Sequence, residues 1–463
     1  MGAEPETLVE IATALAAGRV TARGLAERSL ARIRRFDSRF NAFVALDEAG
    51  ALAAADESDR RRKLGRARSR LDGAPISIKD NLHVSGVAST WGSRALAGFV
   101  PAGDELPVAR LRAAGAVILG KTNVPEFTLE GYTRNDLFGV TRNPWNRELT
   151  PGGSSGGAAA SVTAGFAAAA LGTDGGGSIR RPACHTGLVG FKPSVGRWPR
   201  IDGFPAILGD FETAGALTRT VEDARLLDAL LKGADRRDRR SLYAEAPSWG
   251  AEKLRVLYVP RFGLSPVDPE IAAATDLLAQ HLSRAGHGIE AGEVFFDLDE
   301  AAHIWRVVSR AGVAWLMREN PGFEAKAGAA ARAMAEDGRT ISGADYLDAL
   351  EKVAALRRRI ADLFERFDLV LTPTAAALPW PAAIPYPDRI DGKPAGPRDH
   401  AIFTGWVNIA GLPAISLPIG LSRARLPIGA QFAAGFGVDA SLLAFSAALE
   451  AAMPAPALLT LDD

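Results

Sequence analysis

The sequence contains a single cysteine, Cys184, and no excess of charge of either sign. One cysteine excludes an internal disulfide and leaves no cysteine cluster that would bind zinc. Lys and Arg together number 54, and so do Asp and Glu, so no overall electric field exists to hold nucleic acid or an anionic membrane. A small uncharged or zwitterionic ligand fits this charge balance better.

Long apolar runs are also missing. No apolar stretch without charges reaches the roughly 18 residues expected of a membrane helix. The opening MGAEPETLVE is acidic and does not resemble a secretory signal, so we expect a cytoplasmic protein. Hydrophobic residues make up 47% of the 463 residues and charged residues 23%, and no long polar tract interrupts them. We therefore expect one compact, folded body.

Helical and strand patterns alternate along the chain. The first sixty residues predict helices, for which Thr7 and Thr21 are suitable N-caps. In the segment APISIKDNL, Ile76 and Ile78 alternate with polar residues, as in a strand that packs one face. Lys79 therefore lies near a strand end and faces away from these isoleucines. The helix VARLRAAG followed by the apolar strand AVILG is a unit from which mainly parallel sheets are built.

The segment 151–178 has an unusual composition. It runs PGGSSGG, then AAASVTAGFAAAAL, then GTDGGGS. Because the alanine-rich stretch has almost no large side chains, we expect a helix that packs closely against its neighbours in the centre of the body. Ser154 and Ser155 would lie at the start of this helix, and its far end would deliver Ser178. A flexible linker is the alternative interpretation of GGSSGG.

Three consecutive glycines, Gly175, Gly176 and Gly177, precede Ser178. They allow a close backbone approach and direct successive N–H groups at one point, as an oxyanion hole requires. Ser178 would then be a nucleophile. The structural alternative is that GGGS caps a helix that starts near Ile179, with the serine as N-cap.

A serine nucleophile needs a base, and two are available. His185 follows Ser178 by seven residues and would form a Ser/His/Asp site with Asp174. Lys79 is the other candidate, provided that burial keeps it neutral. A surface lysine paired with Asp80 is the structural alternative for Lys79.

One motif match is misleading. Residues 115–122, GAVILGKT, fit the phosphate-binding pattern G-x-x-x-x-G-K-[ST] letter for letter. In a phosphate-binding loop the strand precedes the first glycine, whereas here the variable residues AVIL are themselves the strand. Pro125 also occupies a position where the following helix should already have begun. We therefore do not expect nucleotide binding.

Taken together, these segments resemble the amidase signature family in order and separation, including the 24 positions from Ser154 to Ser178. The resemblance is specific in the first half and the last quarter of the chain and weak across 234–366. The matching segments are PISIKDN (75–81), GKTNVPEF (120–127), FGVTRNPW (138–145), PGGSSGG (151–157), GTDGGGSIRRPA (172–183), GLVGFKPS (187–194), TRTVEDA (218–224), GLPAISLP (411–418) and LPIGAQ (426–431).

The resemblance implies a Ser–cis-Ser–Lys triad of Ser178, Ser154 and Lys79, with Ser154 before a cis peptide bond. It also implies an oxyanion hole on the backbone of the three glycines. Asp174 and Arg180 would support this turn as a pair, or Arg180 would contact a substrate carboxylate. In the implied reaction Ser178 attacks an amide carbonyl and forms an acyl-enzyme that water hydrolyses, with no metal or organic cofactor.

The resemblance further implies an α/β fold with a central mixed, mostly parallel β-sheet covered by helices on both faces. We expect one domain over 1–463, with core motifs in 74–233, a variable middle region in 234–366, and closing strands and a helix in 367–455. A homodimer is the commonest oligomeric state.

The main functional hypothesis is an amidase that converts a small-molecule amide to a carboxylate and ammonia or an amine. The first alternative is the glutaminase subunit of a tRNA-dependent amidotransferase, which shares the fold and triad. The second is a non-catalytic binding protein on the same fold.

Overall fold

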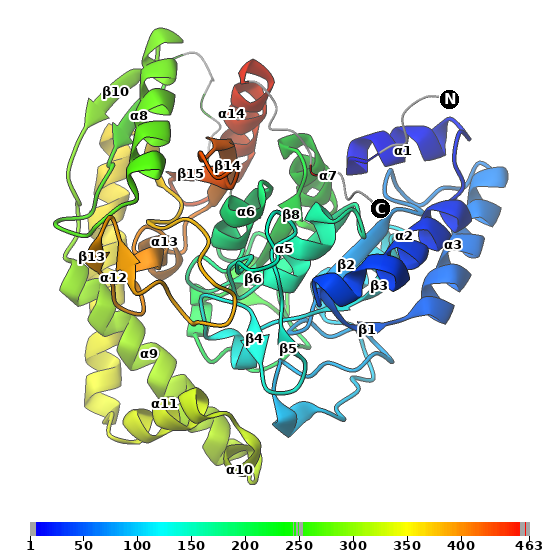
Figure 1. Ribbon diagram of the computed structural model, residues 1–463, viewed down its shortest axis with the longest axis horizontal. Helices are drawn as coiled ribbons and strands as arrows, with labels where there is room; N and C mark the ends of the chain where they lie inside the picture. Colours follow the sequence, from blue (N-terminus) through cyan, green and yellow to red (C-terminus); the bar gives the residue numbers. More distant parts are fainter. Residues whose placement is uncertain (1–5, 244, 247–248, 250–252, 454–458, 460–463) are drawn as a thin grey trace.

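The computed structural model describes residues 6–453, except 244, 247–248 and 250–252, together with 459. Its central element is an 11-stranded sheet in the order β1-β3-β2-β6-β8-β7-β14-β15-β11-β9-β10. The sheet crosses the whole molecule, from β1 at one edge to β10 at the other (Figure 1). Two small two-stranded sheets, β12-β13 and β4-β5, lie outside it.

The elements have the following bounds. The strands are β1 (Phe43–Leu46), β2 (Pro75–Lys79), β3 (Val117–Thr122), β4 (Arg134–Asn135), β5 (Gly139–Val140), β6 (Ala169–Asp174), β7 (Val189–Lys192), β8 (Thr213–Thr218), β9 (Arg255–Tyr258), β10 (Gly288–Ala291), β11 (Leu369–Pro373), β12 (Arg389–Ile390), β13 (Lys393–Pro394), β14 (Ala414–Leu421) and β15 (Pro427–Ala434). The helices are α1 (Leu8–Ala16), α2 (Ala22–Phe36), α3 (Glu48–Lys63), α4 (Leu106–Ala113), α5 (Gly156–Thr163), α6 (Arg180–Thr186), α7 (Val221–Leu231), α8 (Pro269–Arg284), α9 (Leu298–Glu319), α10 (Phe323–Lys326), α11 (Ala329–Arg339), α12 (Gly343–Arg366), α13 (Gly405–Ala410) and α14 (Asp439–Ala452).

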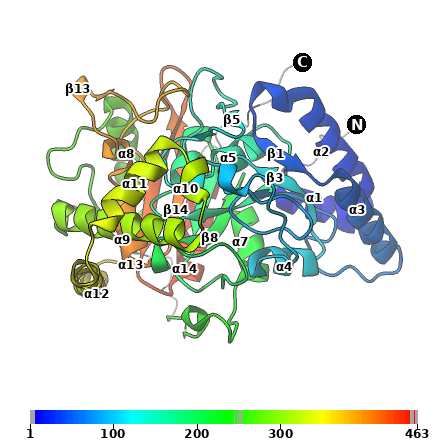
Figure 2. The ribbon, with the colours of Figure 1, turned by 90° about the horizontal axis from the view of Figure 1, so that it is seen from below.

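The expected local elements are confirmed. Thr7 and Thr21 cap α1 and α2, each by accepting a hydrogen bond from a backbone N–H of the first turn. The unit β2-α4-β3 is a parallel strand pair with a crossover helix, as the VARLRAAG and AVILG patterns predict. The middle region alternates strands with long helices, and α9, α10 and α11 lie on the opposite side of the molecule from α1, α2 and α3 (Figure 2).

The mixed sheet is as expected, but its strands are mostly antiparallel rather than mostly parallel. Strands β3, β2 and β6 run parallel to one another, as do β11, β9 and β10. The other neighbouring pairs of this sheet are antiparallel. The difference arises because β7 reaches β8 through a connection without an α-helix, and a short loop joins β14 to β15 as a hairpin.

The prediction of a single central helix between the two serine-containing turns is wrong, because the helix covers only the first part of this stretch. Helix α5 has eight residues and ends at Thr163, and the chain then turns at Gly165, where φ is +70°. Strand β6 follows and delivers the glycine turn, so the stretch is a helix and a strand that run back past each other. All eight residues of α5 are buried, as its small side chains predict.

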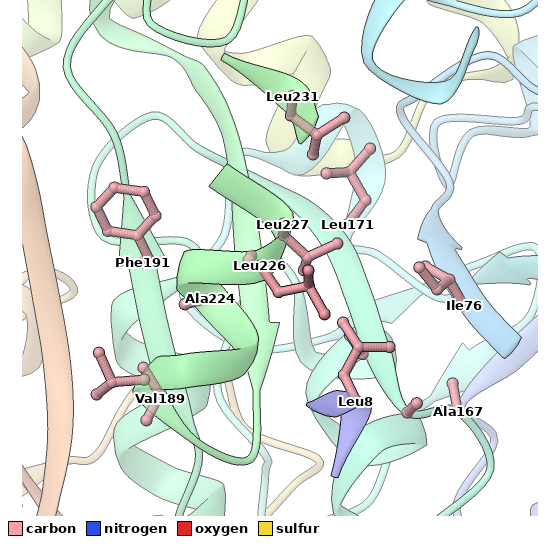
Figure 3. Close-up of a cluster of buried hydrophobic side chains, with 14 of the residues drawn as sticks. Leu8, Ile76, Ala167, Leu171, Val189, Phe191, Ala224, Leu226, Leu227 and Leu231 are labelled. Atoms are coloured by element: carbon pink, nitrogen blue, oxygen red, sulfur yellow. The ribbon is translucent and has the colours of Figure 1, made fainter. Parts of the chain in front are cut away.

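Helices cover both faces of the sheet, as expected. In β6, Ala170 belongs to a small cluster with side chains of α5 and α6, while the next residue, Leu171, packs in the main core. Successive side chains of a strand point to opposite faces, so these clusters lie on opposite sides of the sheet. Figure 3 shows the main core, where Leu8 of α1 and Leu227 of α7 gather near Leu171. Among the described residues, no helix is both long and apolar enough to span a bilayer.

Candidate active site

The candidate site lies at one edge of the central sheet, where β2 and β6 end. These strands are parallel neighbours, with Ile78 of β2 opposite Leu171 of β6, so their carboxyl ends meet. Lys79 is the last residue of β2. Ser178 lies in the turn that connects β6 with α6. The sheet register therefore places the two residues in the same region, although 99 positions separate them in the sequence.

Lys79 is fully buried and contacts one of the predicted serines. Its Nζ donates hydrogen bonds to Oγ of Ser154 at 2.8 Å, to the carbonyl of Thr173 at 3.0 Å and to Oγ1 of Thr173 at 2.9 Å. Burial lowers the pKa of Lys79 to about 7, although the carboxylates of Glu212 and Asp174 partly oppose this effect. A substantial fraction of the molecules thus carries a neutral amine at this position near neutral pH.

The surface alternative for Lys79 is wrong. Asp80 pairs instead with Lys121, at 3.1 Å between Oδ1 and Nζ. Lys121 is the lysine of the GAVILGKT match, and it is buried at the end of β3, where it also donates to Ser89. The variable residues of that match lie on or next to β3, as expected, so they do not form a phosphate-binding loop.

The turn at Ser154 contains a cis peptide bond, which joins Gly153 to Ser154. The cis bond thus precedes Ser154, whereas the resemblance led us to expect it after this residue. The N–H of Ser155 donates to the carbonyl of Ser178 at 3.1 Å, which places the two serine turns side by side. The linker interpretation of GGSSGG is wrong, because Ser154 and Ser155 are completely buried.

Only part of the glycine turn is available as an oxyanion hole. The N–H of Gly177 already donates to Oδ1 of Asp174 at 2.7 Å, whereas the resemblance led us to expect an oxyanion hole on the backbone of all three glycines. Within the described part of the chain, the N–H groups of Gly175, Gly176 and Ser178 donate no hydrogen bond. Gly177 has a φ of +110°, and a Cβ there would lie 2.2 Å from Oγ1 of Thr404, so this position requires glycine.

Ser178 does not act as a helix cap. The N-cap of α6 is Ile179, and it has no side-chain capping bond. The Ser178 side chain makes no hydrogen bond to any described residue and keeps a small exposed fraction of 6%. Its hydroxyl is therefore free to meet a ligand.

Asp174 and Arg180 form a buried pair that holds this turn. Arg180 donates from Nη2 and Nε to the two carboxylate oxygens of Asp174 at 2.8 and 3.0 Å. Burial alone would raise the pKa of Asp174, but the charge and hydrogen bonds of Arg180 outweigh it and hold this pKa well below its usual range. Asn408 and Gln431 satisfy the remaining groups of the pair. Arg180 is thus a support for the turn and is not free to bind a substrate carboxylate.

Replacing Arg180 with methionine is expected to lower the free energy of unfolding by about 3–5 kcal/mol, because the carboxylate of Asp174 would stay buried without its partner. Urea denaturation of the variant measures this change. Arg310→Met is a matched control, since Arg310 pairs with Asp337 at the surface and its loss should cost about 1 kcal/mol or less. If both variants lost the same free energy of unfolding, the buried pair would not contribute more to stability than the surface pair.

The histidine alternative for the base is not supported by the geometry. Burial, with a smaller effect of Arg181, lowers the pKa of His185 to about 3. The ring packs edge-on against Trp380, and Nε2 has no hydrogen-bond partner among the described residues. Asp174 is committed to Arg180 and to the backbone of its own turn, so it does not orient His185.

Sequence reasoning missed several polar residues of this site. Thr173 holds both Lys79 and the amide of Asn81, which donates to Oγ1 at 2.9 Å. Its position one residue before Asp174, in a strand beside the lysine strand, was the available signal. Asn408 and Gln431 carry no local signal, since they meet the turn only through the fold. Among the described residues, no group of three or more His, Cys, Asp or Glu side chains is arranged to hold a metal ion.

The fold and this site place the chain among the amide hydrolases built on one large mixed sheet. The family model named Amidase matches residues 24–443, so the chain belongs to this family, the amidase signature enzymes. The resemblance seen in the sequence is thereby confirmed.

Two curated relatives carry one name, that of the A subunit of glutamyl-tRNA(Gln) amidotransferase. The protein of Myxococcus xanthus is 35% identical over 96% of each chain. Its counterpart in Synechococcus sp. (strain WH7803) is 36% identical over 90% of this chain and 91% of its own. Among solved structures, a bacterial aryl acylamidase of the amidase signature family matches 96% of each chain with a TM-score of 0.89 and 29% identity.

Proposed function

We propose that Ser178 is the nucleophile of an amide hydrolase, with Ser154 and Lys79 as its proton relay. The hydrogen bond from the buried Lys79 to Ser154 is the observation that carries this proposal. A lysine with a pKa near 7 can accept a proton at neutral pH and return it later, which an ordinary surface lysine cannot do.

The reaction follows from the positions of these groups. Neutral Lys79 takes a proton through Ser154 while Oγ of Ser178 attacks the amide carbonyl, and the carbonyl oxygen becomes an oxyanion. The free N–H groups of Gly175 and Gly176 stabilise this charge. The relay then gives the proton to the leaving nitrogen, the C–N bond breaks, and an acyl ester on Ser178 remains. Water adds to this ester, and the carboxylate product leaves.

Two settings are compatible with this chemistry. The chain either hydrolyses a small-molecule amide alone, as the aryl acylamidase likeness supports, or supplies ammonia as the glutaminase subunit of a tRNA-dependent amidotransferase. The names of the curated relatives support the second setting more strongly. The acyl-enzyme on Ser178 is common to both settings.

Ammonia release separates the two settings. Purified protein is incubated with aliphatic and aromatic primary amides and with glutamine, and the ammonia formed is measured. Release from simple amides by the protein alone supports the independent amidase. Release from glutamine only after partner proteins are added supports the amidotransferase setting.

The pH dependence of kcat/KM is expected to report Lys79. Because the base must be neutral, kcat/KM for an uncharged amide should rise with pH, reach half its maximum near pH 7 and level off above it. Glu212→Gln should move the midpoint to lower pH, since the carboxylate of Glu212 raises the pKa of Lys79. Initial rates between pH 5 and 9 measure both profiles. A flat wild-type profile would show that Lys79 is not the titrating base.

A further inference from the structure

A chain of hydrogen bonds connects Lys79 with a carboxylate two strands away. Oγ1 of Thr173 accepts from Nζ of Lys79 and from the amide of Asn81, each at 2.9 Å. Nδ2 of Asn81 also donates to Oε1 of Glu212 at 3.4 Å. The strand order β2-β6-β8 brings these residues together, because Lys79 ends β2, Thr173 lies in β6 and Glu212 directly precedes β8. Asn81 therefore links the catalytic base to Glu212.

Arg200 holds Glu212 and a second carboxylate, that of Glu105. Its Nη1 donates to Oε1 of Glu212 and its Nε to Oε1 of Glu105, both at 2.5 Å. The exposed fractions of the three side chains lie between 1% and 15%. Burial alone would lower the pKa of Arg200, but the two carboxylates outweigh it and hold this pKa above its usual range. Arg200 is therefore charged over the whole pH range in which Lys79 titrates.

The ion pair of Arg200 and Glu212 borders a cavity of about 130 Å³, which Asn81 and Glu105 also line. Oδ1 of Asn81 is buried and has no hydrogen-bond partner among the described residues. The Asn81 amide is thus held through its Nδ2 alone. Because the cavity leaves space beside Glu212, the position of its carboxylate depends on the hydrogen bonds from Arg200.

Four charged side chains act on the amine of Lys79, two of each sign, namely Glu212, Asp174, Arg200 and Arg181. The carboxylates favour the charged amine, and the guanidinium groups favour the neutral one. Asp174 is paired with Arg180, which compensates its charge. Without Arg200, the charge of Glu212 would act on Lys79 without such compensation.

We propose that Arg200 is a positioning residue of the reaction, whose guanidinium holds the Glu212 carboxylate in an ion pair and thereby leaves the amine of Lys79 able to lose its proton. A carboxylate that could approach this buried amine would stabilise the ammonium form, which cannot accept the proton that comes through Ser154. Arg200 thus does for Glu212 what Arg180 does for Asp174. This inference rests on the proposed role of Lys79 as the base.

The pH profile of kcat/KM for an uncharged amide tests the inference. Each profile is measured between pH 5 and 10 and scaled to its own plateau. Arg200→Gln should raise the midpoint by about one pH unit, since it removes a nearby positive charge and keeps a hydrogen-bond donor for Glu212. Arg200→Lys, which keeps the charge, should shift the midpoint by less than half as much. A loss of Arg200 that only disturbed the fold would lower the plateau and leave the midpoint in place.

A double variant tests whether Arg200 acts through Glu212. Glu212→Gln should lower the midpoint, and the Arg200→Gln/Glu212→Gln double variant should return it to near the wild-type value, because one charge of each sign is lost. If Arg200→Gln alone does not fold, the comparison of Glu212→Gln with the double variant measures the same upward shift. A midpoint that stays in place or falls when Arg200→Gln is introduced would overturn the inference.

Arg237→Gln is the matched control. Arg237 pairs with Asp202, which lines the same cavity, but its side chain is 62% exposed and does not contact Glu212. Its loss should leave the midpoint unchanged, since water screens an exposed charge. A shift as large as that of Arg200→Gln would show a general effect of net charge and would overturn the inference.

The proton on Lys79 can also be followed without a substrate. Protein labelled with ¹³C at lysine Cε is titrated by NMR, and the Lys79 resonance is assigned by its absence in Lys79→Met. If the wild type hydrolysed none of the amides, the proposed function would fail for them, but the Lys79 titration midpoint should still rise in Arg200→Gln. An identical Lys79 titration in the wild type and Arg200→Gln would overturn the inference, whether or not the protein hydrolyses amides.

Discussion

Replacing Ser178 with alanine is expected to lower kcat for amide hydrolysis by about 10⁴- to 10⁶-fold, as removal of a nucleophile does in other serine hydrolases. Neither serine of the neighbouring turn is expected to take its place, because Oγ of Ser154 accepts the hydrogen bond of Lys79 and Oγ of Ser155 donates to the carbonyl of Thr173. The ammonia assay measures the loss.

The fold of the Ser178→Ala variant should be intact. The Ser178 hydroxyl makes no hydrogen bond to the described residues, and its neighbours hold the turn through Asp174. We expect an unchanged thermal midpoint and unchanged binding of substrate. If the variant and the wild type released ammonia equally, Ser178 would not be the nucleophile and the proposed triad would be wrong.

Replacing Lys79 with methionine is expected to lower kcat by about 10⁴-fold, because the side chain keeps its approximate volume and loses its proton-transfer group. Ser154 would then have no base. In the Lys79→Met/Ser178→Ala double variant, kcat should fall no further than in Ser178→Ala alone, since the two groups act as one unit. Single-turnover and steady-state rates of purified variants measure these losses.

Lys121 provides a matched control for Lys79. It lies one residue before the end of the neighbouring strand β3 and is equally buried, but its partners are Asp80 and Ser89 rather than the serines of the site. Lys121→Met should therefore reduce stability, through the unpaired Asp80, while the folded fraction retains its kcat within a few-fold. If Lys79→Met and Lys121→Met lost kcat to a comparable extent, Lys79 would not have a specific role in proton transfer.

The sequence predicted best those features of the site that depend on a few adjacent residues. Alternation in PISIK predicts a strand that ends at Lys79, and the glycines before Ser178 predict a tight turn. The small residues of the alanine-rich stretch predict a buried helix, which the structure has over 156–163 only. Each of these features depends on a few adjacent residues, so pattern and resemblance together were sufficient to find the candidate site.

Features that depend on distant contacts were not predictable. Arg180 and Arg181 are the clearest case, because these adjacent residues of the same type lie in opposite environments. Arg180 points to Asp174 and to Gln431, 251 positions away, whereas Arg181 has carbonyl partners only. The mostly antiparallel arrangement of the sheet was likewise not predictable. The direction of a strand depends on how the chain connects it to its neighbours, and the hydrophobic pattern of the strand does not indicate this. The single-domain boundaries, the cytoplasmic location and the homodimer remain predictions.

The dependence of the Ser178 turn on Asn408 and Gln431 has a consequence for synthesis of the chain. Lys79, Ser154 and Ser178 have all been translated before residue 200, yet the pair that holds their turn is completed only by α13 and β15. Such long-range contacts form late, and domains of this size fold as units after much of the chain is available. A nascent chain therefore carries its complete set of reactive residues for most of translation without an organised turn to activate them.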